Sequence, residues 1–138
     1  MKNMMLATVG LMMSLAGTAI AEGDPVKGEK DFKKCRACHA IANGDDVIVK
    51  GGRTGPNLYG LVGRAAGSED FKYGASIMAA GEAGLVWTEE LLVAYIADPR
   101  AFLRENTGDS KAKSKMTFKL KNADDVVAYL ASLAPPAE

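Results

Sequence analysis

The feature that most restricts the fold of this chain is the segment KKCRACHAI, residues 33–41. It contains the only two cysteines, Cys35 and Cys38, and the only histidine, His39, among the 138 residues. Two thiols three positions apart, followed at once by an imidazole, form a compact set of groups that bind metals or react with carbon and sulfur. The rest of the chain has to fold around whatever this segment holds.

Three chemistries compete for the segment. Cys-x-x-Cys-His is the attachment sequence of c-type haem, in which each thiol adds to one vinyl group and the histidine binds the iron. A thiol redox pair requires its cysteines at a helix N-terminus within a βαβ pattern, and a disulfide across two residues would be cramped. Zinc requires about four ligands, and the chain has no further Cys or His. We therefore predict one covalent haem c on Cys35 and Cys38, with His39 as an axial ligand.

The N-terminus has the layout of a cleaved secretory signal peptide. A head with Lys2 precedes a short apolar run, and Ala19-Ile20-Ala21 precedes the acidic Glu22. We predict a signal peptide over 1–21 and one mature domain over 22–138. The alternative is a retained anchor, because an apolar run of about seventeen residues reaches the lower limit for a spanning helix. Export favours haem further, since thiols outside the cytoplasm are oxidised or captured.

Helix signals appear in three parts of the mature chain. The first helix starts at Asp24-Pro25, which supply a cap and a preset first residue, and it runs into the cysteines. The second lies in WTEELLVAYIADP, with Thr88 as its cap and Pro99 marking its end. The third lies in the tail NADDVVAYLASLAPP, with Asn122 as its cap and an apolar stripe along one side.

The segments between these helices are irregular. A short helical turn is expected over 99–104, whereas 51–67 is dense in Gly and 105–115 is polar. No stretch alternates long enough to predict a strand. The expected fold is therefore all-α, with three to five helices and long loops. Because so little regular packing cannot form a tight core alone, a large apolar group is expected at its centre.

The sixth iron ligand is expected to be a methionine, because the chain has no second histidine. Met78 lies in SIMAAGEAG and is expected to fill the core, as most lone methionines do. Met116 lies beside Phe118 in a polar loop that has no hydrophobic reason to hold it, so we predict Met116 as the ligand. Neutral Lys113 or Lys115 is a further alternative, disfavoured because exposed lysines are protonated.

Over nearly all of its predicted mature length the chain resembles the class I cytochromes c, in particular the bacterial cytochrome c2 type that is close to mitochondrial cytochrome c. The segments that carry this resemblance are, in order, GEKDFKKCRACH, TGPNLYGLVGR, FKYG, WTEELLVAYIADP, KM and DDVVAYL. It implies a single-domain cytochrome c fold wrapped around one haem. Sixteen residues separate Pro99 from Met116, more than in the short family members and as in larger bacterial ones.

The resemblance also implies roles for individual residues. The carbonyl of Pro56 would bond the second ring nitrogen of His39 and fix the ring. Tyr95 would lie beside the sulfur of Met116. Three residues would bond the haem propionates: Arg64, Tyr73 and Trp87. The first and last helices would cross where four residues meet: Gly28, Phe32, Tyr129 and Leu130.

The function implied by the resemblance is one-electron transfer without catalysis of a reaction. The protein would be a periplasmic monomer with no stable membrane anchor. Its electrons would come from a cytochrome bc1-type complex and pass to an oxidase, a reaction centre or a reductase. The alternative is a five-coordinate haem that binds small gases or peroxide, which requires Met116 to leave the iron.

Charge is balanced overall but unevenly distributed. The chain has 17 basic and 17 acidic side chains, so net charge gives no indication of a nucleic-acid partner. Acidic pairs occur at 45–46, 89–90 and 124–125. Seven lysines flank the predicted iron ligands: Lys33, Lys34, Lys111, Lys113, Lys115, Lys119 and Lys121. We predict that they form a Lys-rich haem edge that steers acidic partners, the alternative being an ordinary solvated loop.

Overall fold

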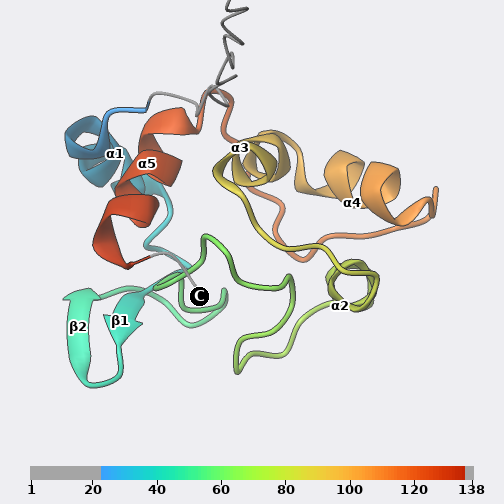
Figure 1. Ribbon diagram of the computed structural model, residues 1–138, viewed down its shortest axis with the longest axis horizontal. Coiled ribbons are helices and arrows are strands. Elements are labelled where there is room, and N and C mark those ends of the chain that lie inside the picture. The colour runs from blue at the N-terminus through green and yellow to red at the C-terminus, as the bar shows by residue number, and fades with distance from the viewer. Residues whose placement is uncertain (1–22, 136–138) are drawn as a thin grey trace, which may run out of the picture.

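The computed structural model of the protein describes residues 23–135, so the predicted signal peptide lies outside the described residues. Within them the chain forms five α-helices, one 3-10 turn and one two-stranded antiparallel sheet (Figure 1). The elements are, in order, α1 (Pro25–Asp31), the 3-10 turn (Phe32–Lys34), β1 (Ile41–Asn43), β2 (Asp46–Val49), α2 (Ala75–Glu82), α3 (Glu89–Ala97), α4 (Pro99–Thr107) and α5 (Asp124–Leu133). The predicted helical fold with long loops is confirmed.

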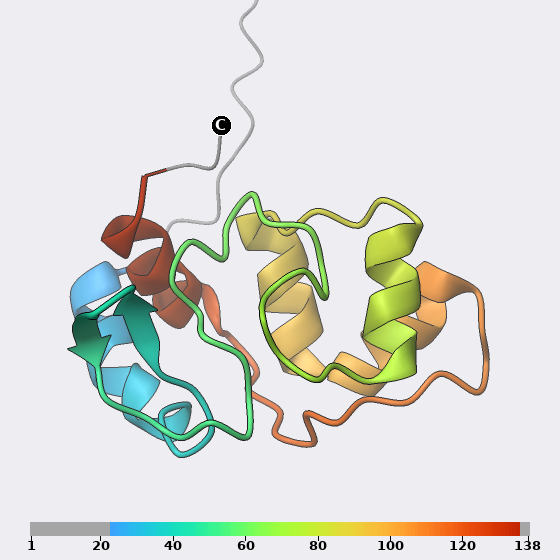
Figure 2. The same cartoon turned by 90° about the horizontal axis from the view of Figure 1, so that it is seen from below.

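Helices α1 and α5, at opposite ends of the chain, pack against each other (Figures 1 and 2). A Cβ atom on Gly28 would overlap the main-chain carbonyl of Asp125, so only glycine allows this close approach. The rings of Phe32 and Tyr129 meet at the same crossing, 5.9 Å apart. The crossing expected from the resemblance is therefore present, and it fixes the segment that leads into the cysteines.

Two predicted helix caps are confirmed. The side chain of Asp24 accepts from the backbone N–H of Val26 at 2.9 Å, and that of Thr88 accepts from Leu91 at 3.2 Å. The predicted cap at Asn122 is wrong. Helix α5 starts at Asp124 after Ala123, and Asn122 has a φ of 60°, a left-handed conformation that asparagine adopts more readily than most residues.

The helix that begins at Pro99 is longer than expected. Asp98 caps it through the N–H of Ala101 at 3.0 Å, and α4 continues to Thr107 before Gly108 ends it. Phe102 and Leu103 are both buried, so α4 is amphipathic, and its polar last turn faces the solvent. Part of the segment predicted as loop is therefore helical.

The prediction that the chain has no strand is wrong for residues 41–49. Strands β1 and β2 pair antiparallel around a turn in which Gly44 has a φ of +59°. The sequence contained a hairpin signal, because the turn-forming residues Asn43, Gly44 and Asp45 lie between the apolar stretches 41–42 and 47–49. The strands are too short for alternation to reveal them, and β2 leaves Val47 and Ile48 exposed.

Helix α2 was not expected, and the prediction for Met78 is also wrong. Met78 lies on α2 with 39% of its surface exposed, so it does not fill the core. The helix buries Ala80 and turns Ile77 towards the interior, which leaves Met78 on the outer side. Its many small residues gave no apolar periodicity to read.

Helix α3 contacts both α4 and α5 and lies between them (Figures 1 and 2). An aromatic cluster connects α3 with its neighbours, with ring centroids of Trp87 5.0 Å from Tyr95 and 5.7 Å from Phe102. In the described part of the chain, every helix is too short or too polar to cross a bilayer.

Candidate functional site

A cavity of about 370 Å³ lies inside the fold, a volume typical of sites that hold a cofactor. Its walls are largely apolar, formed among others by Phe32, Leu58, Leu61, Ile77, Leu92, Ile96, Leu103 and Val126. All nine predicted site residues line it as well: Cys35, Cys38, His39, Pro56, Arg64, Tyr73, Trp87, Tyr95 and Met116. The cavity therefore provides the space for the large apolar group expected from the sequence.

The cysteine segment forms one wall of this cavity. The backbone N–H groups of Cys38 and His39 both donate to the carbonyl of Cys35, at 3.1 and 3.0 Å, which closes a helical turn. The turn directs both thiols and the imidazole to one cavity. The two cysteines are not joined to each other, and burial raises the pKa of Cys35 to about 11. A protonated, buried thiol is the opposite of the activated thiolate of a redox pair.

The zinc interpretation finds no support in this fold. No group of three or more His, Cys, Asp or Glu side chains that could hold a metal ion occurs among residues 23–135. Within the described residues, the histidine and the sulfur side chains that line the cavity are those of the cysteine segment and Met116. That set is suited to an iron porphyrin rather than to a bare ion.

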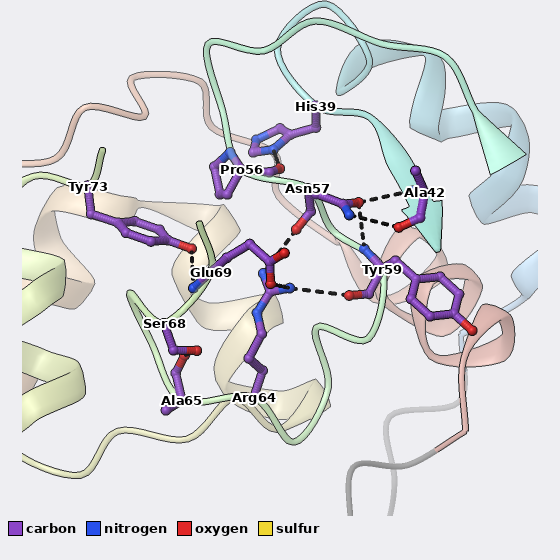
Figure 3. A network of polar contacts seen from close by, with 10 residues as sticks. All are labelled: His39, Ala42, Pro56, Asn57, Tyr59, Arg64, Ala65, Ser68, Glu69 and Tyr73. Carbon is purple, nitrogen blue, oxygen red and sulfur yellow. Dashed lines mark hydrogen bonds and ion pairs between the residues drawn. The ribbon is translucent and has the colours of Figure 1, made fainter. Parts of the chain in front are cut away.

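His39 is oriented by the loop that follows β2. Its Nδ1 lies 2.8 Å from the carbonyl oxygen of Pro56, and because a carbonyl only accepts, Nδ1 carries the proton (Figure 3). The lone pair of Nε2 is therefore available for a metal. Burial lowers the pKa of His39, and the bond to Pro56 raises it in part. The imidazole is neutral at neutral pH, which is the form that binds metals.

The glycine-rich loop 51–67 packs directly against the cysteine segment. The N–H of Gly55 donates to the carbonyl of Cys38 at 2.8 Å, and that of Leu58 donates to Ala40 at 3.1 Å. A Cβ atom on Gly55 would collide with the ring of His39. The sequence uses glycine here because the backbone itself forms the wall behind the histidine.

Arg64 and Tyr73 line another part of the cavity and belong to a network of polar contacts (Figure 3). The backbone N–H of Trp87 donates to the backbone carbonyl of Arg64 at 2.9 Å, which brings the glycine-rich loop against the start of α3. The guanidinium of Arg64 pairs with Glu69 at 3.0 Å, and the hydroxyl of Tyr73 accepts from the N–H of Glu69 at 3.2 Å. Burial raises the pKa of Tyr73, so its hydroxyl stays protonated.

The role of Glu69 was not predicted from the sequence. Its partner Arg64 lies five positions earlier, and both occupy irregular loops in which no periodicity predicts contacts. The only available signal was charge complementarity between an arginine and a carboxylate close in sequence. That signal is common on protein surfaces and does not by itself mark a site.

Met116 lies in the C-terminal part of the sequence, far from the cysteines along the chain, and is half-buried against the cavity. Its carbonyl accepts from the hydroxyl of Ser114 at 2.9 Å. Tyr95 on α3 lines the same cavity. Burial raises the pKa of Tyr95, and the hydroxyl of Ser114 lowers it in part. Met78, by contrast, is not among the residues that line the cavity.

The long segment before Met116 is tied to the rest of the molecule. The N–H of Lys113 donates to the hydroxyl of Ser76 on α2 at 2.9 Å, and the ammonium of Lys115 donates to the carbonyl of Lys72 at 3.0 Å. Ala112 is buried at 1% exposure. Residues 108–115, between α4 and Met116, therefore form an anchored loop at the cavity.

The fold and this site define a class: a small helical protein with a c-type haem pocket, in which the attachment segment and a methionine-bearing loop line one apolar cavity. The donor set fits the group, because two thiols and a neutral, oriented imidazole lie together with a thioether and a cavity wall that is mostly apolar.

Comparisons with known proteins agree. Residues 25–134 match the family model described as Cytochrome c. The chain is 56% identical to cytochrome c-551 of Roseobacter denitrificans over 131 residues, 94% of each chain. It is 52% identical to cytochrome c2 of Rhodobacter capsulatus over 136 residues, 96% of this chain and 98% of that one. The crystal structure of ferric cytochrome c-550 from Paracoccus versutus matches with a TM-score of 0.79 and 56% identity, covering 83% of this chain and 100% of that one.

The chain therefore belongs to the cytochrome c family. It is an electron-transport protein that contains one covalently attached haem c, and Cys35 and Cys38 fit the Cys-x-x-Cys-His attachment motif.

Proposed function

We propose that this protein is a one-electron carrier of the bacterial periplasm whose haem iron has His39 and Met116 as its axial ligands. The observation that carries the proposal is that these two side chains, 77 positions apart, line one cavity, with His39 neutral and oriented by Pro56. The iron supplies the exchange of one electron between its ferrous and ferric states. A thioether ligand and an apolar pocket both favour the ferrous state and a positive potential.

Within this proposal the polar residues hold the propionates. Arg64 has five N–H donors, of which three are used by Tyr59, Asn57 and Glu69 within the described residues. Two donors therefore stay available for a carboxylate at the cavity. Tyr73 and the indole of Trp87 lie at the same cavity and provide an O–H and an N–H.

The chain's own residues favour transfer without bond chemistry. The apolar walls exclude water from the site, and the anchored loop keeps the sulfur of Met116 at the cavity. We therefore propose that the protein breaks no substrate bond and is not an enzyme. The five-coordinate alternative requires Met116 to leave, which the anchoring of its loop disfavours.

Location and partners complete the proposal. A signal peptide over 1–21 would deliver residues 22–138 to the periplasm, where a cytochrome bc1-type complex would be the donor. An oxidase, a reaction centre or a reductase would be the acceptor. Lys34, Lys113 and Lys115 line the cavity and are exposed, which supports a positive haem edge. Lys119 contributes less, because it pairs with Asp98 at 2.9 Å.

Carbon monoxide tests the ligand set. We expect the reduced protein to show no spectral change with carbon monoxide, because a held thioether occupies the sixth position. Met116→Ala should bind the gas readily. Met78→Ala is the matched control, since it removes the other mature methionine away from the cavity and should behave as the unmodified protein does. Ready binding by the unmodified protein would favour the five-coordinate alternative.

A further inference from the structure

Asn57 makes an unusual set of bonds for a loop side chain. Its Oδ1 accepts from the backbone N–H groups of Ala42, at 3.0 Å, and Tyr59, at 3.1 Å (Figure 3). Its Nδ2 donates to the carbonyl of Ala42 at 2.8 Å. The amide thus pairs with both backbone groups of one residue in β1, a two-point contact that fixes direction as well as distance.

These bonds lie next to the bond that orients the histidine. Ala42 follows His39 by three residues, and Asn57 directly follows Pro56. The side chain of Asn57 therefore joins the segment that follows His39 to the segment that follows Pro56, whose carbonyl accepts the hydrogen bond from Nδ1. Pro56 has no N–H and cannot anchor itself, so its neighbours must place its carbonyl.

We infer that Asn57 is a positioning residue for the axial histidine. By clamping the Pro56 loop to β1, it holds the Pro56 carbonyl on Nδ1 of His39 and keeps the imidazole strongly electron-donating. The inference rests on the proposed function, in which His39 binds the iron. Nothing in the sequence marks this role, because the partner of the asparagine is the backbone of a strand fifteen residues away.

The backbone around Asn57 is held independently of its side chain. Its carbonyl accepts from Nη2 of Arg64 at 3.1 Å, and the N–H of Leu58 donates to Ala40 at 3.1 Å. A substitution of the side chain leaves these bonds in place. The variant Asn57→Ala should therefore fold and take up haem while the Pro56 carbonyl loses part of its restraint.

Hydrogen exchange of the Nδ1 proton of His39 measures that restraint directly. It would be followed by NMR in the reduced, haem-loaded protein, with the amide proton of buried Val127 in α5 as the reference for global opening. We expect exchange of the His39 proton to be about tenfold faster in Asn57→Ala than in the unmodified protein, relative to Val127. The matched control is Asn106→Ala, which removes one side-chain bond to the carbonyl of Phe102 on α4. Asn106→Ala should leave the ratio unchanged.

The reduction potential gives a second reading. A weaker bond from Nδ1 makes the imidazole a poorer donor, which destabilises the ferric state, so the potential of Asn57→Ala should rise while that of Asn106→Ala stays constant. Asn57→Asp retains both acceptor bonds but replaces the donor to Ala42 by a carboxylate oxygen that faces the Ala42 carbonyl, so exchange of the His39 proton should again be faster than in the unmodified protein. If Asn57→Ala fails to accumulate, Asn57→Asp decides: exchange as slow as in the unmodified protein would overturn the inference.

Two further results would overturn it. One is an unchanged exchange ratio and potential in Asn57→Ala. The other is an increase that Val127 shares in proportion, which would reduce Asn57 to a contributor to overall stability. A failure of the proposed function looks different, because the unmodified protein would then lack a histidine-ligated spectrum before any variant is compared.

Discussion

Gly55 illustrates how a single missing side chain shapes the haem pocket. A Cβ atom there would collide with the ring of His39, so we expect Gly55→Ala to displace the imidazole and to increase the high-spin fraction of the ferric haem. The absorption spectrum of the oxidised protein measures this fraction. Gly74→Ala is the control, because its φ of −71° suits alanine and its Cβ would lie 3.5 Å from Lys115, an ordinary contact. A low-spin spectrum in Gly55→Ala would show that a side chain at position 55 fits behind His39 without displacing the imidazole.

At this scale the sequence was informative where chemistry requires a residue type. The cysteines, the histidine and the methionine are chemically distinctive, and all of them line the cavity. Asn57 and Glu69 were not singled out, because their partners are backbone groups or a side chain in irregular loops. Only the fold brings such partners together, and no local pattern encodes them.

At the scale of elements, the crossing of α1 and α5 depends on Gly28. Glycine to alanine in an exposed helix usually stabilises a protein by roughly 0.5–1 kcal/mol. Here the added Cβ would overlap the carbonyl of Asp125, so we expect Gly28→Ala to lower the free energy of unfolding by about 1–3 kcal/mol. Denaturant unfolding of the haem-loaded protein measures it. Equal or greater stability in the variant would show that the two helices can separate without cost.

The same crossing predicts a pH dependence. Asp125 pairs with Lys27 at 2.8 Å and accepts from the N–H of Asp24, also at 2.8 Å. The bond from Lys27 first, then that from Asp24, lowers the pKa of Asp125 below its ordinary 3.8. A lowered pKa stabilises the fold above the ordinary value, and this stabilisation is lost as the pH falls from 3.8 through the folded pKa.

Asp125→Asn removes this contribution. The stability difference between the unmodified protein and the variant should be greatest near neutral pH and should shrink below 3.8, as denaturant titrations at several pH values would show. The pKa of Lys27 is raised above 10.5, so its part is present below that value and is lost as the pH rises through the folded pKa. A difference that stays constant down to acid pH would rule out the pair as its source.

Helices could be predicted where the sequence has a capping side chain or a continuous apolar face. Asp24 and Thr88 capped helices as expected, because a side-chain acceptor at the first turn is a local requirement. The hairpin over 41–49 and helix α2 were missed for a different reason. Each is short, and its own sequence has little periodicity. The two strands mainly contact each other, and α2 packs against α4.

For the whole molecule, the distribution of lysines predicts how it meets a partner. Replacing Lys113 by Gln should slow electron transfer from a cytochrome bc1 complex several-fold at low salt and reduce the dependence of the rate on ionic strength. Lys119→Gln is the comparison within the cluster and should have the smaller effect, because Lys119 already pairs with Asp98. Stopped-flow kinetics over a range of salt concentrations measures both. A rate insensitive to salt in the unmodified protein would remove the steering role.

The central claim is that His39 and Met116 are the two axial ligands of one haem iron. Its most direct test is the absorption spectrum of the oxidised protein in the long-wavelength region, where a methionine sulfur bound to ferric iron gives a charge-transfer band. We predict that the band is present in the unmodified protein and in Met78→Ala, and is absent in Met116→Ala. A band that persists without Met116, or that is missing from the unmodified protein, would contradict the proposed ligand set.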